Sequence, residues 1–194
     1  GKTRAITHRI AYAAAIGTMD PQKVLALTFT AKAAGEMRAR LRSLGVPTVA
    51  ARTIHSAALK QLLYFWPSVF GGRTPDLMTT KTGFLTEAIN RAGLSDSIRA
   101  TNRELMRDIA SEIEWAKVSQ VAPSDYVDEI SKRMQKPRVL PEQMVQIYTA
   151  YESVKKQELA IDFEDVLLLC AAMLEEEREV RERVQDQYRY FTID

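Results

Sequence analysis

Apolar residues in the first third of the chain alternate between helical spacing and short continuous runs. Apolar residues at every third or fourth position, which indicate helices, cover residues 4–17, 31–45 and 54–66. Short apolar runs of strand length, residues 23–29 and 48–53, separate these helices. Alternating helices and strands predict a parallel sheet with right-handed crossover connections, which is an α/β fold.

The pattern changes after Pro67. From Lys81 to about Lys156 the apolar spacing is almost wholly helical, in segments that glycine and proline interrupt. We therefore expect an all-helical subdomain, residues 76–176, inserted into the α/β layer. The α/β layer itself would comprise residues 1–75 and 177–194.

The last part of the chain predicts one more helix and one more strand. The helix lies in IDFEDVLLLCAAMLEEE, where Asp162 can cap its start. Asp165, three residues later, can bond back to the amide of the cap residue, as in a capping box. YRYFTID has the aromatic and β-branched content of a strand that ends in a carboxylate.

Composition narrows the class of protein. The 194 residues are 46% hydrophobic and 27% charged, which is typical of a soluble globular chain. No apolar run is long enough to span a membrane, and one cysteine, Cys170, makes the cytoplasm the expected location. Residues 1–60 carry ten Lys or Arg and two acids, whereas residues 160–194 carry ten acids and four Arg. A basic first third suits a phosphate-rich partner, although a solvated helix face explains scattered arginines equally well.

Residues at the two ends of the chain have the chemistry expected of a nucleotide-binding site. Gly1-Lys2-Thr3 are the last three residues of a GxxxxGK(S/T) phosphate loop, placed where a helix opens. Lys2 would reach the phosphates there, and the Thr3 hydroxyl would bind magnesium. Asp194 ends the last strand, where its carboxylate would hold the same magnesium through water. Together they predict half of a site for a nucleotide and Mg²⁺.

The junctions that follow the first two strands suit a nucleic acid. They are Thr28-Phe29-Thr30 and Thr53-Ile54-His55-Ser56. Hydroxyls beside helix-start amides bind phosphate oxygens, and an aromatic ring offers a face on which a base can stack. Each junction judged alone is equally well an ordinary helix cap with a buried phenylalanine. Together with Gly1-Lys2-Thr3 and Asp194 they make four polar junctions. Four such junctions at the ligand-binding edge of one sheet favour a binding site.

Five blocks of the sequence occur in a characteristic order and spacing. They are GKTRAITHRIAYAAAIG, VLALTFTAKAAGEMRARL, ARTIHSAALKQLLYF, IDFEDVLLL and YRYFTID. Together they resemble the amino-terminal half of the UvrD/Rep/PcrA group of superfamily 1 DNA helicases, and the resemblance covers essentially the whole chain. QLLYFWP and EIEWAK look closest to the second UvrD paralogue of actinobacteria. The resemblance implies a partial RecA-like ATPase domain with an inserted helical subdomain, in an enzyme that uses ATP to move 3′ to 5′ along single-stranded DNA.

The resemblance also implies roles for individual residues. Lys2 and Thr3 would be the Walker A lysine and magnesium ligand, and Asp194 the first acid of the Walker B motif. Arg4 would stack on adenine, and Arg38 would approach the nucleotide. Phe29 would stack on a base within a set of DNA-contacting positions, which are Thr28, Phe29, Thr30, His55 and Ser56. IDFEDVLLL is similar to the DFxDL block of the family, to which we assign no chemistry.

Other family features do not occur in these 194 residues. They are the glycine-rich start of the phosphate loop, the glutamate after Asp194 and the arginine finger of a second motor domain. We therefore expect the sequence to be the stretch between two nucleotide-binding motifs, and to be inactive as an isolated ATPase. The expected partners are single-stranded DNA and repair proteins. Two alternatives stay open: a non-enzymatic module that binds single-stranded DNA or protein, and a P-loop kinase.

Overall fold

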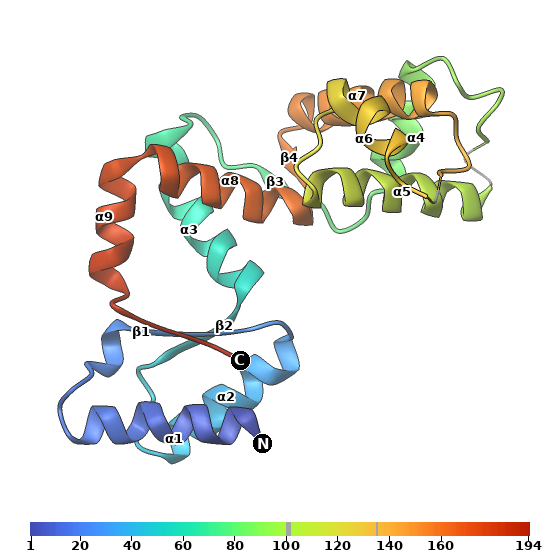
Figure 1. Cartoon of the computed structure of the whole chain (residues 1–194). Coiled ribbons are helices and arrows are strands. Elements are labelled where there is room, and N and C mark those ends of the chain that lie inside the picture. Colours follow the sequence, from blue (N-terminus) through green and yellow to red (C-terminus); the bar gives the residue numbers. More distant parts are fainter. Residues whose placement is uncertain (100–101, 135) are drawn as a thin grey trace. The chain divides into compact units, whose positions relative to one another are not determined.

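The computed structural model of the chain describes residues 1–99, 102–134 and 136–194, in two compact units (Figure 1). Unit 1 comprises Gly1–Arg73 and Val166–Asp194, and unit 2 comprises Thr74–Asp165. Unit 1 contains α1 (Lys2–Ala15), a 3₁₀ turn (Pro21–Lys23), β1 (Val24–Thr28), α2 (Ala31–Ser43), β2 (Ala50–Thr53), α3 (Ile54–Val69), α9 (Arg178–Gln187) and β5 (Tyr190–Ile193). Unit 2 contains β3 (Asp76–Leu77), α4 (Thr82–Arg91), α5 (Arg103–Val118), a 3₁₀ turn (Pro123–Asp125), α6 (Tyr126–Ser131), α7 (Pro141–Gln157) and β4 (Ala160–Ile161). The helix α8 (Phe163–Glu176) begins in unit 2 and continues in unit 1.

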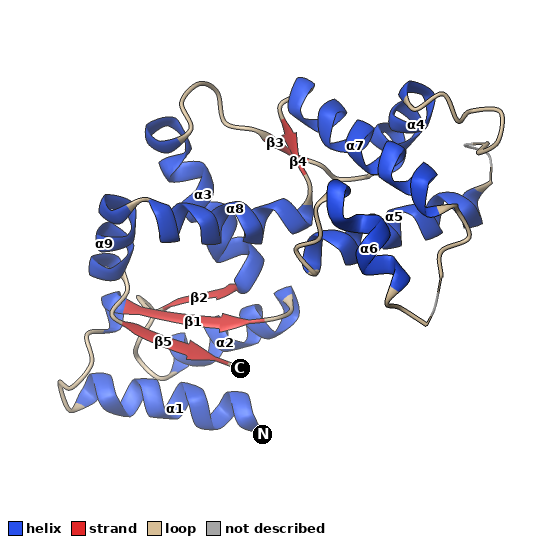
Figure 2. Cartoon of the chain, turned by 45° about the horizontal axis from the view of Figure 1, so that its top comes forward, coloured by secondary structure: helices blue, strands red, loops and turns tan. Residues whose placement is uncertain are grey.

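The sheet of unit 1 has three strands in the order β2-β1-β5, and both pairings are parallel (Figure 2). Leu25 of β1 lies opposite Ala50 on one side and Phe191 on the other. Three consecutive residues of β1, Val24 to Ala26, are buried, as expected for a central strand that is covered on both faces. The predicted α/β layer with a parallel sheet is confirmed.

Successive residues of β1 point to opposite faces of the sheet, and helices cover both faces. Val24 and Ala26 pack with residues of α1 and α2, among them Ile10 and Met37. Leu25 points the other way and packs with Ala57 of α3, together with Tyr188 and Val184 at the end of α9. The helices are therefore fixed to the sheet by apolar contacts, which hold their first turns beside the ends of the strands.

Unit 2 is built on an apolar core between α4, α5, α6 and α7. The largest fully buried side chains in this core are Ile89, Ile109, Ile113, Tyr126, Ile130, Met144, Ile147 and Tyr151. Their spacing along each helix is three or four residues, which is the pattern that predicted helices here. None of the described helices is both long and apolar enough to cross a lipid bilayer.

The expectation that this segment is all-helical is wrong in one respect. β3 and β4 form a two-stranded parallel sheet, in which Asp76 lies opposite Ala160 and Leu77 lies opposite Ile161. The amide of Asp76 donates to the carbonyl of Leu159 at 2.9 Å, which begins the pairing. Each strand has only two residues, so the apolar spacing in the sequence has no period from which to reveal it.

Candidate functional site

The carboxyl ends of β1, β2 and β5 lie along one edge of the sheet, because all three strands are parallel. Thr28 lies opposite Thr53, and Leu27 lies opposite Ile193. Asp194 therefore follows β5 at the level of Thr28, and its amide donates to the carbonyl of Leu27 at 2.9 Å. This edge is where open α/β sheets bind ligands.

Thr3 and Asp194 are in direct contact at this edge. Thr3 Oγ1 donates to Asp194 Oδ2 at 2.5 Å, although 191 positions separate the two residues in the sequence. Thr7, which is fully buried one turn further along α1, donates its hydroxyl to the carbonyl of Thr3 at 3.1 Å. A hydroxyl and a carboxylate in contact offer two oxygen ligands of the kind that Mg²⁺ takes. The chemistry of these two residues fits the predicted metal.

The start of α1 is open to solvent. Gly1 is its N-cap, and among the described residues no side-chain cap bond is formed there. Lys2 and Arg4 are exposed on the first turn. Uncapped amides at a helix start, together with nearby cations, favour an anion such as a phosphate group.

Arg38 occupies a different environment. Its guanidinium donates from Nη1 to the carbonyl of Ala51 in β2 at 2.8 Å, which ties α2 to the neighbouring strand. In the described part of the chain, no hydrogen bond or ion pair joins Arg38 to Thr3 or Asp194. The structure therefore shows a direct contact between Thr3 and Asp194, and it shows the exposed Arg38 bonded to β2 through one guanidinium nitrogen.

The two junctions predicted for DNA combine helix caps with an exposed ring. Thr30 Oγ1 accepts from the Ala33 amide at 3.1 Å, and Thr53 Oγ1 accepts from the Ser56 amide at the same distance. Both threonines are thus helix caps, as one interpretation of the sequence held. The buried phenylalanine of that interpretation is wrong, since the Phe29 side chain is 78% exposed.

The remaining predicted DNA positions differ in exposure. Thr28 is 3% exposed, so Phe29 and Thr30 form the accessible surface of the first junction. At the second junction Ser56 is exposed and His55 is partly buried. The hydroxyl of Ser56 donates to the carbonyl of Thr53 at 3.0 Å, which orients it on the first turn of α3.

A second polar group, of which the sequence singled out only the cap residues Asp162 and Asp165, lies inside unit 2. We name it the lysine–carboxylate cluster, and its members are Lys117, Tyr151, Glu152, Lys155, Asp162 and Asp165. The side chains of Lys117 and Lys155 are each 3% exposed, and that of Asp162 is 1% exposed. Lys117 Nζ lies 2.7 Å from Asp162 Oδ2, and Lys155 Nζ lies 2.9 Å from the same oxygen. Two helices of unit 2, α5 and α7, therefore meet at one buried carboxylate.

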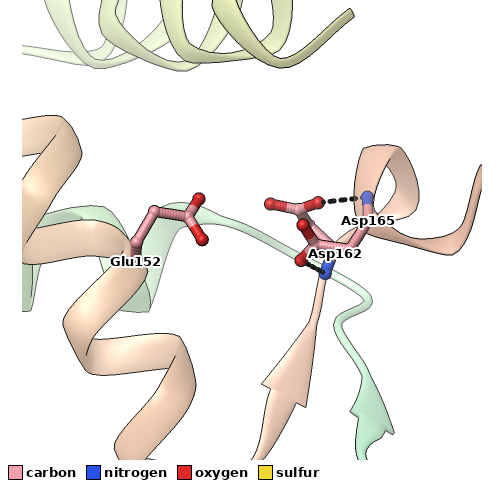
Figure 3. A group of neighbouring side chains, drawn as sticks. All are labelled: Glu152, Asp162 and Asp165. Carbon is pink, nitrogen blue, oxygen red and sulfur yellow. Dashed lines mark hydrogen bonds between the residues drawn. The ribbon is translucent and has the colours of Figure 1, made fainter. Parts of the chain in front are cut away.

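The predicted capping box at the start of α8 is confirmed. Asp165 Oδ2 accepts from the Asp162 amide at 3.0 Å, and Asp162 Oδ1 accepts from the Asp165 amide at 2.9 Å (Figure 3). The same two carboxylates accept from the buried lysines, with Lys155 Nζ 2.6 Å from Asp165 Oδ2 and Lys117 also bonded to Asp165. The cap and the ion pairs thus share their acceptor groups.

Glu152, Asp162 and Asp165 also have the composition of a cation site. One oxygen of each lies within 4.8 Å of the others (Figure 3). Lys117 and Lys155 already donate to these carboxylates, and Lys155 lies 3.0 Å from Glu152. Because two ammonium groups offset two of the three negative charges and already bond to all three carboxylates, we assign the cluster a structural role.

The electrostatics of the cluster keep its ion pairs charged. Burial raises the pKa of Asp162, but Lys117 and Lys155 outweigh burial and hold that pKa well below its usual range. Burial lowers the pKa of Lys117, but Asp162, Glu152 and Asp165 outweigh it, and the net shift is upward. Burial and the nearby Asp162 raise the pKa of Tyr151, so its phenol stays protonated and donates to Asp162 Oδ2 at 3.2 Å.

We predict that Asp162→Asn destabilises unit 2 by about 3–5 kcal/mol at neutral pH, because it leaves two buried ammonium groups short of a partner. Hydrogen exchange of the α5 and α7 amides in the full-length protein measures this loss. Because the pKa of Asp162 is lowered by folding, its carboxylate stabilises the fold fully above the unfolded-state pKa of about 3.9. This stabilisation is lost as the pH falls from that value toward the lower folded-state pKa. The difference between wild type and variant should therefore shrink in acid.

Glu104→Gln is the matched control for this prediction. Glu104 pairs with Arg138 at 2.9 Å, but both side chains are more than half exposed, so the pair is screened by solvent. Protection in Asp162→Asn equal to that in Glu104→Gln would contradict the structural role of the cluster.

Comparison with known proteins matches this chain along its whole length. The family described as "UvrD/REP helicase N-terminal domain" matches residues 1–194. The ATP-dependent DNA helicase UvrD2 of Mycobacterium tuberculosis is 40% identical over 205 aligned residues, which cover all of this chain and 29% of the relative. The ATP-dependent DNA helicase PcrA of Leuconostoc citreum is 29% identical, and that of Bacillus subtilis is 27% identical. Each PcrA alignment covers all of this chain and 25% of the relative, so the chain spans less than a third of the length of these proteins. The chain belongs to the UvrD/REP helicase N-terminal domain family.

Proposed function

We propose that the protein containing this chain is an ATP-dependent DNA helicase or translocase that moves 3′ to 5′ along single-stranded DNA. The observation that carries the proposal is the contact between Thr3 and Asp194 at the same sheet edge that exposes Phe29. One edge then serves both the nucleotide and the DNA track. The relatives named as DNA helicases support this function, and DNA repair or recombination is its proposed setting.

The proposed nucleotide is ATP with Mg²⁺. Gly1, Lys2 and the first amides of α1 would hold the phosphates, and Arg4 would stack on adenine. Thr3 and Asp194 would hold the metal, which when bound supplies positive charge beside the phosphates. The 2.5 Å contact between the hydroxyl and the carboxylate supports this pairing. For Arg38 we propose that the guanidinium approaches the nucleotide, while its hydrogen bond to Ala51 ties α2 to β2.

The proposed DNA track crosses the junctions after β1 and β2. Phe29 would stack on a base, and Thr30 and Ser56 would face the backbone phosphates. Thr28 and His55, which are less exposed, would complete the set of DNA-contacting positions. The exposure of Phe29 supports stacking, since a ring that is 78% exposed gains from covering by a base. The ten Lys or Arg among residues 1–60 support an electrostatic attraction to the phosphates.

We propose a domain organisation that follows from this function. Residues 1–75 and 177–194 would form part of a RecA-like ATPase domain, and residues 76–176 a subdomain inserted into it. The chain leaves unit 1 after Arg73 and re-enters it at Val166, so the compact unit 2 supports an insertion, although residues 166–176 cluster with unit 1. Repair proteins are proposed partners of the whole protein.

We predict distinct effects of two substitutions on ATP hydrolysis by the full-length protein. Single-stranded DNA should stimulate the wild-type rate. Lys2→Ala should abolish turnover with and without DNA, because it removes the positive charge that would contact the phosphates. Phe29→Ala should retain basal turnover and lose most of the stimulation. Hydrolysis that is indifferent to DNA in the wild type would contradict the DNA track at the sheet edge.

We also predict that the isolated 194-residue chain does not hydrolyse ATP at a meaningful rate. The sequence contains Asp194 but neither a glutamate after it nor the arginine finger of the family, and such groups supply factors of about 10³ or more in rate. Phosphate release by the isolated chain, measured with and without single-stranded DNA, checks this. A turnover that DNA stimulates would contradict it.

A further inference from the structure

A groove of about 340 Å³ lies on unit 1 between α3 and α9, which pack on the same face of the sheet (Figure 2). Four residues of α3 and two residues of α9 line it, namely Lys60, Gln61, Tyr64, Phe65, Arg183 and Gln187. The lining combines two cations, two aromatic rings and two amides, and it contains no carboxylate. This composition is typical of surfaces that bind single-stranded nucleic acid.

The groove continues from the predicted DNA junction along one stripe of α3. Ser56, Lys60 and Tyr64 follow one another at intervals of four residues and are all exposed. Residues at this spacing lie on the same side of a helix. From Ser56 to Tyr64 the stripe is about 12 Å long at 1.5 Å per residue. That length equals about three to four stacked nucleotides at 3.4 Å per nucleotide.

Tyr64 presents an aromatic ring that is 65% exposed. Arg183 fixes its orientation, since Nη2 donates to the Tyr64 hydroxyl at 3.2 Å and the guanidinium carbon lies 5.7 Å from the ring centre. Phe65 lies under the same guanidinium at 5.0 Å and contacts the Tyr64 ring edge-on at 4.8 Å. A mostly exposed aromatic ring is thus held at the surface by its contacts with Arg183 and Phe65.

The polar groups of the groove complement a nucleotide. Lys60 is exposed, and it forms no ion pair with any residue in the described ranges. The amide of Gln61 donates to Oε1 of Gln187 at 3.2 Å, which leaves further amide donors and acceptors for the edge of a base. A cation, a ring and amides together address a phosphate, a base face and a base edge.

We propose that this groove binds a nucleotide of single-stranded DNA and extends the DNA track from Ser56 through Lys60 to Tyr64. The inference rests on the proposed function and adds a binding site to it. An acidic protein segment is the less suitable occupant, because it would use the two cations but neither the exposed ring nor the amide pair. The base stacks on Tyr64, and Lys60 contacts the preceding phosphate.

We predict that Tyr64→Ala in the full-length protein weakens binding to an oligothymidylate of about sixteen nucleotides by about 5- to 150-fold, the range expected for loss of one base–aromatic stack. Tyr64→Phe keeps the ring and its contacts with Arg183 and Phe65 but loses the hydroxyl, and it should weaken binding much less than Tyr64→Ala does. Lys60→Ala should lower the slope of log affinity against log salt by about one. Fluorescence anisotropy measures all of these affinities.

Tyr12→Ala is the matched control, because Tyr12 on α1 is 67% exposed and lies outside the groove. Tyr64→Ala equal to Tyr12→Ala, with Phe29→Ala still impaired, would overturn the inference and leave the proposed function intact. Wild-type protein that does not bind the oligothymidylate would instead overturn the proposed function. If Tyr64→Ala weakened binding of an oligoaspartate peptide and not of DNA, the occupant would be an acidic protein segment, and the inference would be wrong.

Discussion

The parallel pairing of β1 with β2 and β5 is the constraint on which the candidate site depends. Because the strands are parallel, their carboxyl ends share one edge, and residues far apart in the sequence meet there. Asp194 extends the β5 ladder, because its amide donates a hydrogen bond to the carbonyl of Leu27. This places its carboxylate against Thr3. Phe29 and Ser56 stand beside the same edge because α2 and α3 begin directly after β1 and β2.

The apolar contacts of the sheet explain why these residues keep their positions. Ile10 of α1 and Met37 of α2 are almost fully buried against one face of β1, and Ala57 of α3 is buried against the other. A helix held this way presents its first turn at a fixed height above the strand ends. The exposed groups of the edge therefore rest on buried apolar groups one or two turns away. The candidate site residues and the packing residues are therefore different residues of the same helices.

Unit 2 is stabilised by a different principle. Its helices share an apolar core, but α5, α7 and the start of α8 also converge on the buried carboxylate of Asp162. Such a group stabilises the fold only while all its partners are present, because an unmatched buried charge is costly. The carboxylate therefore links α5, α7 and the start of α8 directly to one another.

Local patterns in the sequence were sufficient for much of this structure. The helices α1, α2 and α3 and the strands β1 and β2 were predicted from their apolar spacing or runs. The strand β5 was predicted from its aromatic and β-branched content, although none of its four residues is buried. α9 was not predicted as a separate helix, since Val180 is its one fully buried residue and most of its other positions are charged or amide-bearing. β3 and β4 were missed because two-residue strands have no period.

The contact of Thr3 with Asp194 followed from the motifs, whereas the partners of Asp162 did not. The spacing of Asp162 and Asp165 predicted the capping box correctly, but lysine is a residue type usually found on surfaces. Nothing in the local sequence marks Lys117 or Lys155 as buried. Their role depends on contacts with Asp162, which lies 45 positions after Lys117 and 7 positions after Lys155 in the chain. The one sequence signal for Lys117 was its place in EIEWAK, a block that resembles the family.

The pairing of Thr3 and Asp194 around a magnesium nucleotide is the central claim, and binding of a fluorescent ATP analogue to the full-length protein tests it most directly. Affinity measured across a magnesium titration should be magnesium-dependent in the wild type and in Asp96→Asn, an exposed aspartate of unit 2. Asp194→Asn should weaken the magnesium-dependent component by about 10- to 100-fold, as expected for a residue that holds the metal through water. Equal magnesium dependence in Asp194→Asn and in the wild type would contradict the account.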